Sequence, residues 1–100
     1  MSKLNEVLDA NEFVIVTAGA EWCGYCKRFA PIFEEVAQEH GKMYVFSKVN
    51  VQEEAEFPKN HGISGFPTTL FFRNGKEVGR EVGALTKENF TASIAKHFVK

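Results

Sequence analysis

The hydrophobic and polar positions along the chain predict an alternation of helices and strands. Residues 3–10 place apolar side chains at helical spacing, which indicates a short amphipathic helix. Residues 13–16 form a continuous apolar run of the kind found in strands that are buried on both faces. From about residue 23 to residue 40, an apolar stripe repeats with the period of a helix and comprises Phe29, Ile32, Phe33, Val36 and Ala37. We therefore expect a long helix here that ends at Gly41 and is kinked at Pro31.

The second half of the chain continues this alternation. Residues 43–51 predict a strand that ends in alternating valines, and residues 53–61 predict a short helix that ends at Gly62. The last helix is expected to begin after Thr86, because a threonine hydroxyl can accept a hydrogen bond from the first turn. Its apolar stripe comprises Phe90, Ile94 and Phe98.

A hairpin signal completes the topology. Residues 68–73 and 76–82 predict two strands joined by Asn74-Gly75, a dipeptide that strongly favours a tight β-turn. These two strands are antiparallel, whereas the first two strands flank a crossover helix and should be parallel. The order of elements therefore predicts an α/β fold, a four-stranded mixed sheet with helices on both faces.

Length and charge limit the classes of function. One hundred residues make a single domain, residues 1–100, that can bury a core without disulfide staples. Twelve basic and thirteen acidic residues give a formal charge of −1, with no block of like charge for nucleic acid or a membrane surface. No apolar run has the length of a signal peptide or of a span of about 20 residues. We expect a cytoplasmic monomer, unless a signal peptide has been removed.

The candidate chemistry lies in Trp22-Cys23-Gly24-Tyr25-Cys26, where a buried strand runs into a helix. Free backbone N–H groups and the helix dipole would stabilise a thiolate on Cys23 at the helix start. Cys26 follows one turn later, close enough to form a disulfide with Cys23. A thiolate can attack a substrate disulfide, and a second thiol can then resolve the mixed disulfide. We expect Cys23 to be the exposed nucleophile and Cys26 the buried resolving thiol.

A metal site is the alternative for this cysteine pair. Structural zinc uses four ligands, and the chain has no second cysteine pair. His40, His61 and His97 each fall in the last turn of a predicted helix, where histidine interacts favourably with the negative helix end. The pattern favours redox chemistry over metal binding, and neither a metal nor another cofactor is expected.

The segment from Trp22 to Lys27 resembles the active site of the thioredoxin superfamily. Matches in the same order support this resemblance: Gly65-Phe66-Pro67-Thr68 is similar to the family's cis-proline loop, Pro31 to its helix-kinking proline, Lys48 to a lysine of its second strand, and Gly83-Ala84 to the Gly-Ala after its last strand. The matches extend from about residue 12 to residue 98. The resemblance implies a thioredoxin-like fold and a protein disulfide oxidoreductase, with protein disulfides or thiols as substrates and a reductase or small thiol as electron donor.

The resemblance also implies a substrate rim, formed by Trp22, Tyr25, Phe66, Pro67, Gly83 and Ala84. Without it, a trans bond before Pro67 would be expected, because only about 5–6% of such bonds are cis in folded proteins. The resemblance implies the cis form. Plain packing is the alternative role for Trp22, and Glu21 is expected to be a solvated loop charge.

Three departures from the family are expected to matter. Tyr25 occupies the position where thioredoxins usually have proline, so Gly24-Tyr25 predicts a more oxidising dithiol than that of a typical thioredoxin. Too few residues precede residue 13 for the family's first strand, so that strand is expected to be absent and the 43–51 strand to lie at the sheet edge. Thr17 replaces a buried acid and cannot act as a base near neutral pH. Lys48 either is a plain surface lysine or favours a thiolate by its charge.

A binding module is the competing function. A thioredoxin-like fold can serve as an adaptor whose redox activity is incidental. An adaptor does not need Cys23, Cys26 and Pro67 together, so the retained set favours an enzyme.

Overall fold

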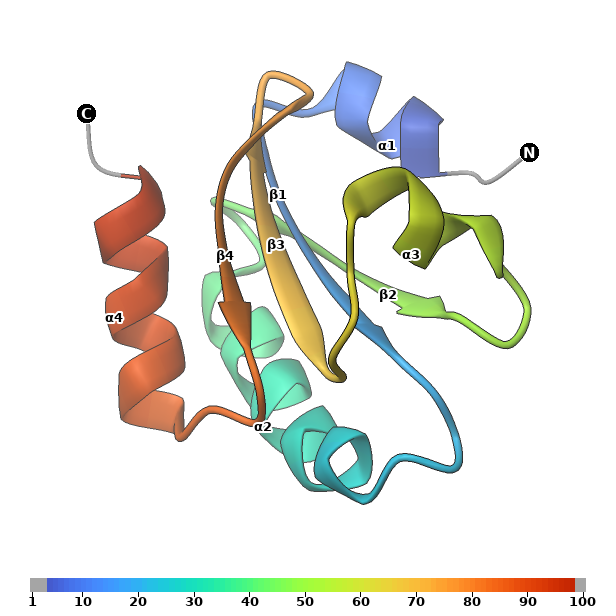
Figure 1. Ribbon diagram of the computed structural model, residues 1–100. Helices are drawn as coiled ribbons and strands as arrows, with labels where there is room; N and C mark the ends of the chain where they lie inside the picture. The colour runs from blue at the N-terminus through green and yellow to red at the C-terminus, as the bar shows by residue number, and fades with distance from the viewer. Residues whose placement is uncertain (1–3, 99–100) are drawn as a thin grey trace.

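The computed structural model describes residues 4–98 and contains the eight elements in the predicted order. Figure 1 shows the helices on the two sides of the sheet, with α1 and α3 on one side and α2 and α4 on the other. The predicted start of the first helix, at residue 3, lies outside the described residues. The elements are α1 (Leu4–Ala10), β1 (Phe13–Gly19), α2 (Gly24–His40), β2 (Val45–Asn50), α3 (Glu56–His61), β3 (Thr68–Arg73), β4 (Lys76–Val82) and α4 (Lys87–Phe98).

The sheet has the strand order β2-β1-β3-β4. β1 is parallel to β2 and antiparallel to β3, and β3 is antiparallel to β4, which confirms the predicted mixed sheet. The register places Thr17 of β1 between Lys48 of β2 and Thr69 of β3. Within residues 4–98 the first element is a helix, and β2 is an edge strand.

Each face of the sheet carries its own hydrophobic core, and this explains the continuous apolar run in β1. Val14 and Val16 point to the face covered by α1 and α3, where Leu4, Leu8, Phe57 and Ile63 pack. Ile15 points to the opposite face, where α2 and α4 contribute an aromatic-rich core. The ring of Phe33 stacks on that of Phe90, with centroids 5.6 Å apart. The members of this second core are Ile15, Phe29, Phe33, Val36, Phe71, Phe90, Ile94 and Phe98.

The turns explain which predicted element bounds are correct and which are shifted. Asn74 and Gly75 have φ values of 53° and 82°, as a type I′ hairpin requires, and both flanking strands have the predicted bounds. β2 begins two residues later than predicted, because the amides of Met43 and Tyr44 both donate to the carbonyl of His40. These bonds extend the end of α2 into a turn. The α3 helix also begins late, at Glu56, after a turn whose amides donate to the carbonyl of residue 50.

The longest helix, α2, contains Pro31 on its exposed side, and the kink expected there remains a prediction. None of the helices within residues 4–98 is both long and apolar enough to cross a membrane.

Candidate active site

Cys23 is the N-cap of α2 and therefore sits immediately before the first helical residue, Gly24. Its backbone is extended, with φ −90° and ψ 114°, and its sulfur accepts the backbone N–H of Cys26 at 3.2 Å. The helix thus points one of its free N–H groups at the Cys23 sulfur, together with the positive end of its dipole. Both interactions stabilise a thiolate, as the sequence predicted for this position.

The predicted exposures of the two cysteines are wrong. Cys23 is 6% exposed, whereas Cys26 is only half-buried. The sulfur of Cys23 is covered because it lies between the start of α2 and the loop before β3, where it donates a 3.7 Å hydrogen bond to the carbonyl of Phe66. Cys26 is less covered because it borders a pocket. Both thiols are free.

Burial raises the pKa of Cys26 to about 11, and a hydrogen bond with the Cys23 thiol adds to this effect. The sulfur of Cys26 lies against Gly19, the last residue of β1. A Cβ atom at position 19 would lie 2.9 Å from it, which is inside van der Waals contact. Gly19 therefore leaves the space that the Cys26 thiol occupies. The sequence showed this glycine only as a break in the strand pattern, since its contact with Cys26 depends on how β1 packs against α2.

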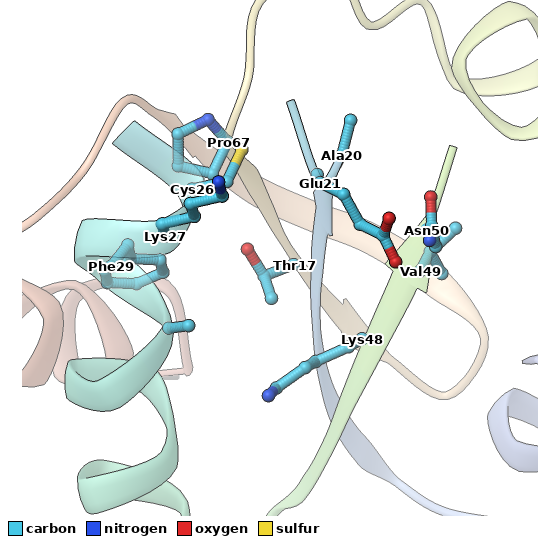
Figure 2. A pocket seen from close by; sticks show the side chains of 12 residues that line it. Thr17, Ala20, Glu21, Cys26, Lys27, Phe29, Lys48, Val49, Asn50 and Pro67 are labelled. Carbon is cyan, nitrogen blue, oxygen red and sulfur yellow. The ribbon is translucent and has the colours of Figure 1, made fainter. Parts of the chain in front are cut away.

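The pocket beside Cys26 has a volume of about 410 Å³ and lies between α2 and the first two strands. Figure 2 shows the Thr17 hydroxyl and the Lys48 amine extending into this space, with Cys26 and Pro67 at one end of it. Its lining comprises Thr17, Gly19, Ala20, Glu21, Cys26, Lys27, Phe29, Ala30, Lys48, Val49, Asn50 and Pro67. Four predicted site residues, Thr17, Cys26, Lys48 and Pro67, thus share one cavity.

Thr17 and Lys48 are direct partners in the β1–β2 register. The hydroxyl oxygen of Thr17 accepts a hydrogen bond of 3.4 Å from Thr69, so this position holds a neutral hydroxyl where the family resemblance implied an acid. The ammonium of Lys48 forms an ion pair with Glu34 of α2. Its charge is therefore partly balanced, and the pair ties edge strand β2 to the helix. Neither of the two interpretations from sequence included this partner.

The predicted rim lies on the other side of Cys23. Trp22 and Tyr25 are 66% and 61% exposed, and the ring of Trp22 meets that of Phe66 edge to face at 6.0 Å. The peptide bond between Phe66 and Pro67 is cis. Val82, which is 64% exposed, adds an apolar side chain that sequence analysis did not single out. Its position next to the predicted Gly83 was the available signal.

One backbone hydrogen bond and one side-chain contact support this rim. Gly83 donates its N–H to the carbonyl of Pro67 at 2.7 Å and has a φ of 102°, a conformation that favours glycine. Ala84 follows it and is exposed. The guanidinium of Arg28 lies over the Tyr25 ring, 5.3 Å from its centroid.

The arrangement supports dithiol chemistry: one sulfur receives a helix N–H, and the second sulfur, hydrogen-bonded to the first, has a raised pKa. Gly24 separates the two cysteines together with Tyr25, and a Cβ atom at position 24 would meet nothing within 4 Å. Within residues 4–98, no three His, Cys, Asp or Glu side chains gather into a group that could hold a metal ion.

Comparison with known proteins gives a consistent result. The thioredoxin family model matches residues 2–96. The thioredoxin of Acidithiobacillus ferridurans is 42% identical over 89 residues, which are 89% of this chain and 82% of that protein. The thioredoxin of Pseudomonas aeruginosa is 41% identical over 90 residues, with the same two coverages. The structure of Plasmodium falciparum thioredoxin superposes with a TM-score of 0.87 at 37% identity, over 95% of this chain and 91% of that one. The chain is therefore a thiol–disulfide oxidoreductase that belongs to the thioredoxin family.

Proposed function

We propose that this oxidoreductase exchanges its dithiol with disulfides in extended protein segments, with Cys23 as the nucleophile and Cys26 as the resolving thiol. The observation that carries this assignment is the 3.2 Å hydrogen bond from the N–H of Cys26 to the Cys23 sulfur at the start of α2. A sulfur held in this way is stabilised as a thiolate, which is the reactive form. The raised pKa of Cys26 suits a thiol that reacts second.

The proposed reaction has two displacements. The Cys23 thiolate attacks one sulfur of the substrate disulfide, and the other substrate sulfur leaves with the electron pair and is protonated by solvent. Cys26 then loses its proton and attacks the Cys23 sulfur, which forms the Cys23–Cys26 disulfide and expels the second substrate sulfur. The substrate gains two electrons, and the dithiol loses them.

The exposed rim is the proposed contact for these substrates. The ring of Trp22 meets that of Phe66, Val82 lies near Gly65 in the same loop, and Tyr25 is a further large exposed side chain beside Cys26 in the sequence. Large exposed apolar side chains gathered in one place mark an interaction surface. Substrates that carry apolar residues beside their disulfide should therefore react faster than polar ones.

The proposal also covers the redox poise and the partners. The Gly24-Tyr25 spacer has no proline, and this supports a dithiol more oxidising than that of a typical thioredoxin. A reductase or a small thiol is the proposed electron donor, and a monomer in the cytoplasm is the proposed working form. Size-exclusion chromatography tests the monomer, and localisation of the tagged chain tests the cytoplasmic location.

Insulin reduction by dithiothreitol tests the main assignment. The wild type should accelerate the reaction, and Cys23→Ser should abolish the acceleration. Cys26→Ser should instead accumulate a mixed disulfide between Cys23 and the insulin chain, detectable by mass spectrometry. Wild-type rates equal to those of dithiothreitol alone would favour the adaptor function.

A further inference from the structure

The loop between α3 and β3, residues 62–67, brings Phe66 to the dithiol. The carbonyl of Phe66 accepts the hydrogen bond from the Cys23 thiol at 3.7 Å, and its ring meets that of Trp22 edge to face. Figure 1 shows this loop running from α3 to the end of the sheet where β3 begins. A displacement of the loop would therefore move Phe66 away from both partners.

The guanidinium of Arg80, on β4, holds the place where this loop starts. It donates one hydrogen bond to the carbonyl of His61 at 2.7 Å and another to the carbonyl of Gly62 at 3.2 Å. His61 is the last residue of α3 and Gly62 is its C-cap, and carbonyls at a helix end have no partner within the helix. Arg80 therefore joins β4 to the end of α3, directly before the loop.

Glu77 fixes the orientation of this guanidinium. Its two carboxylate oxygens accept hydrogen bonds from Nε and Nη2 of Arg80, at 2.6 Å and 2.8 Å. Two parallel bonds of this kind set the plane of the guanidinium as well as its position. The two side chains are 32% and 28% exposed, and ion pairs that solvent reaches contribute little to the stability of a fold. The pair is therefore better suited to orient the helix end than to stabilise the chain.

Two further contacts continue from β4 along the loop. Arg80 and Val82 are two residues apart on the strand and so point to the same face of the sheet. Val82 lies near Gly65, where a Cβ atom would be 3.3 Å from its side chain. Gly83 donates its N–H to the carbonyl of Pro67 at 2.7 Å. The end of β4 thus contacts the start, the middle and the end of the loop.

We propose that Arg80 is a positioning residue for protein substrates, because it fixes the start of the loop 62–67 and thereby the place of Phe66 in the rim. This inference rests on the proposed function, in which extended protein segments bind at the rim. Without the guanidinium, the loop would become ordered only when a substrate binds, and the cost of that ordering would weaken binding. A small disulfide that reacts with Cys23 without using the rim would not meet this cost.

The first test compares a protein disulfide with a small one. Arg80→Met keeps an unbranched stem and removes the four hydrogen bonds described above. We expect KM for fluorescein-labelled insulin to rise about fivefold at unchanged kcat, which is the pattern of lost substrate binding. The second-order rate constant with Ellman's reagent should change by less than about twofold. A parallel loss of both reactions would indicate a merely structural role and refute the inference.

Arg73 provides the matched control. Its guanidinium pairs with Glu12 at 3.4 Å and lies over the Phe13 ring, and its side chain is 30% exposed, close to that of Arg80. These partners lie where β1 begins, whereas the dithiol follows the end of β1. Arg73→Met should leave KM for insulin within about twofold of the wild type. An equal KM in the Arg80→Met and Arg73→Met variants would overturn the inference, while insulin reduction by the wild type would leave the proposed function intact. A wild type that reacts with Ellman's reagent and does not reduce insulin would overturn both.

The second test uses Glu77, which acts on the loop only through Arg80. Glu77→Gln should raise KM for insulin less than Arg80→Met does, and it should change nothing further in the Arg80→Met background. Hydrogen exchange of the segment 62–67, followed by mass spectrometry, should be faster in Arg80→Met and unchanged in Arg73→Met. Equal exchange of this segment in the wild type and Arg80→Met, or additive effects of the two substitutions on KM, would refute the role given to Arg80.

Discussion

Replacing Thr17 with aspartate should accelerate the resolving step near neutral pH. In the reduced chain, burial and a hydrogen bond with the Cys23 thiol raise the pKa of Cys26 to about 11. Burial, the larger cause, also acts in the mixed disulfide, so few Cys26 sulfurs are thiolates at pH 7. The resolving rate of the wild type should therefore rise about tenfold per pH unit above neutrality. A carboxylate at position 17 would line the same pocket as Cys26 and could accept its proton directly or through water. General-base catalysis contributes about 10²–10⁴-fold at its best, so we expect a gain of at least about tenfold at pH 7.

The assay follows the mixed disulfide of Cys23 with a coloured thiol, made by reaction with Ellman's reagent. Attack by Cys26 then releases a second coloured thiol at a rate that does not depend on the reagent concentration. Stopped-flow absorbance follows this release between about pH 6 and pH 9. Thr17→Asn is the matched control, because it has the same shape as aspartate and no basic oxygen. Aspartate should also lower the free energy of unfolding by about 1–3 kcal/mol, because a half-buried carboxyl loses hydration. Equal resolving rates for wild type, Thr17→Asn and Thr17→Asp would refute the role given to Thr17.

Three further predictions concern the reduction potential, a buried glycine contact and the pH dependence of stability. The reduction potential should lie between about −270 and −180 mV, and Tyr25→Pro should lower it; equilibration with glutathione at about −270 mV or below would contradict this. Gly79→Ala should lower the free energy of unfolding by about 1–3 kcal/mol in urea, because its Cβ would overlap the His97 ring; Gly24→Ala, with open space around it, should not. The reduced chain should lose stability relative to the oxidised chain between about pH 9 and pH 11, because unfolding releases the proton of Cys26 there. Parallel denaturation curves of the two forms measure this difference, and a constant difference would contradict it.

The parts of the fold that could be predicted are those that neighbouring residues decide. Asn74-Gly75 adopts positive φ values wherever a two-residue hairpin is formed, so the bounds of β3 and β4 followed directly. The apolar run of β1 required cover on both faces, and two cores provide it. The location of the dithiol at the start of α2 was equally local, since a strand running into a helix defines that junction.

The parts that could not be predicted depend on side chains brought together from distant positions. The exposures of the two cysteines were wrong because the Phe66 carbonyl, 43 residues away in sequence, covers Cys23. The Lys48–Glu34 ion pair depends on how α2 crosses the edge strand, which the spacing of polar residues does not specify. The starts of β2 and α3 shifted because each preceding turn is set by two amides that donate to one carbonyl, of His40 and of Asn50.

The position of β1 within the sheet limits which substitutions can reshape the pocket beside the dithiol. β1 is hydrogen-bonded along both of its edges, to β2 and to β3, and it supplies Thr17 and Gly19 to the pocket wall. A shift of one residue in its register would turn its aromatic-core and pocket side chains to the opposite face. β2 is bonded along one edge only and supplies Lys48, Val49 and Asn50 to the lining beside it, whereas α2 forms the opposite wall. Selection or design can therefore reshape the cavity through β2 and the turn after it, while the backbone beneath the dithiol stays fixed.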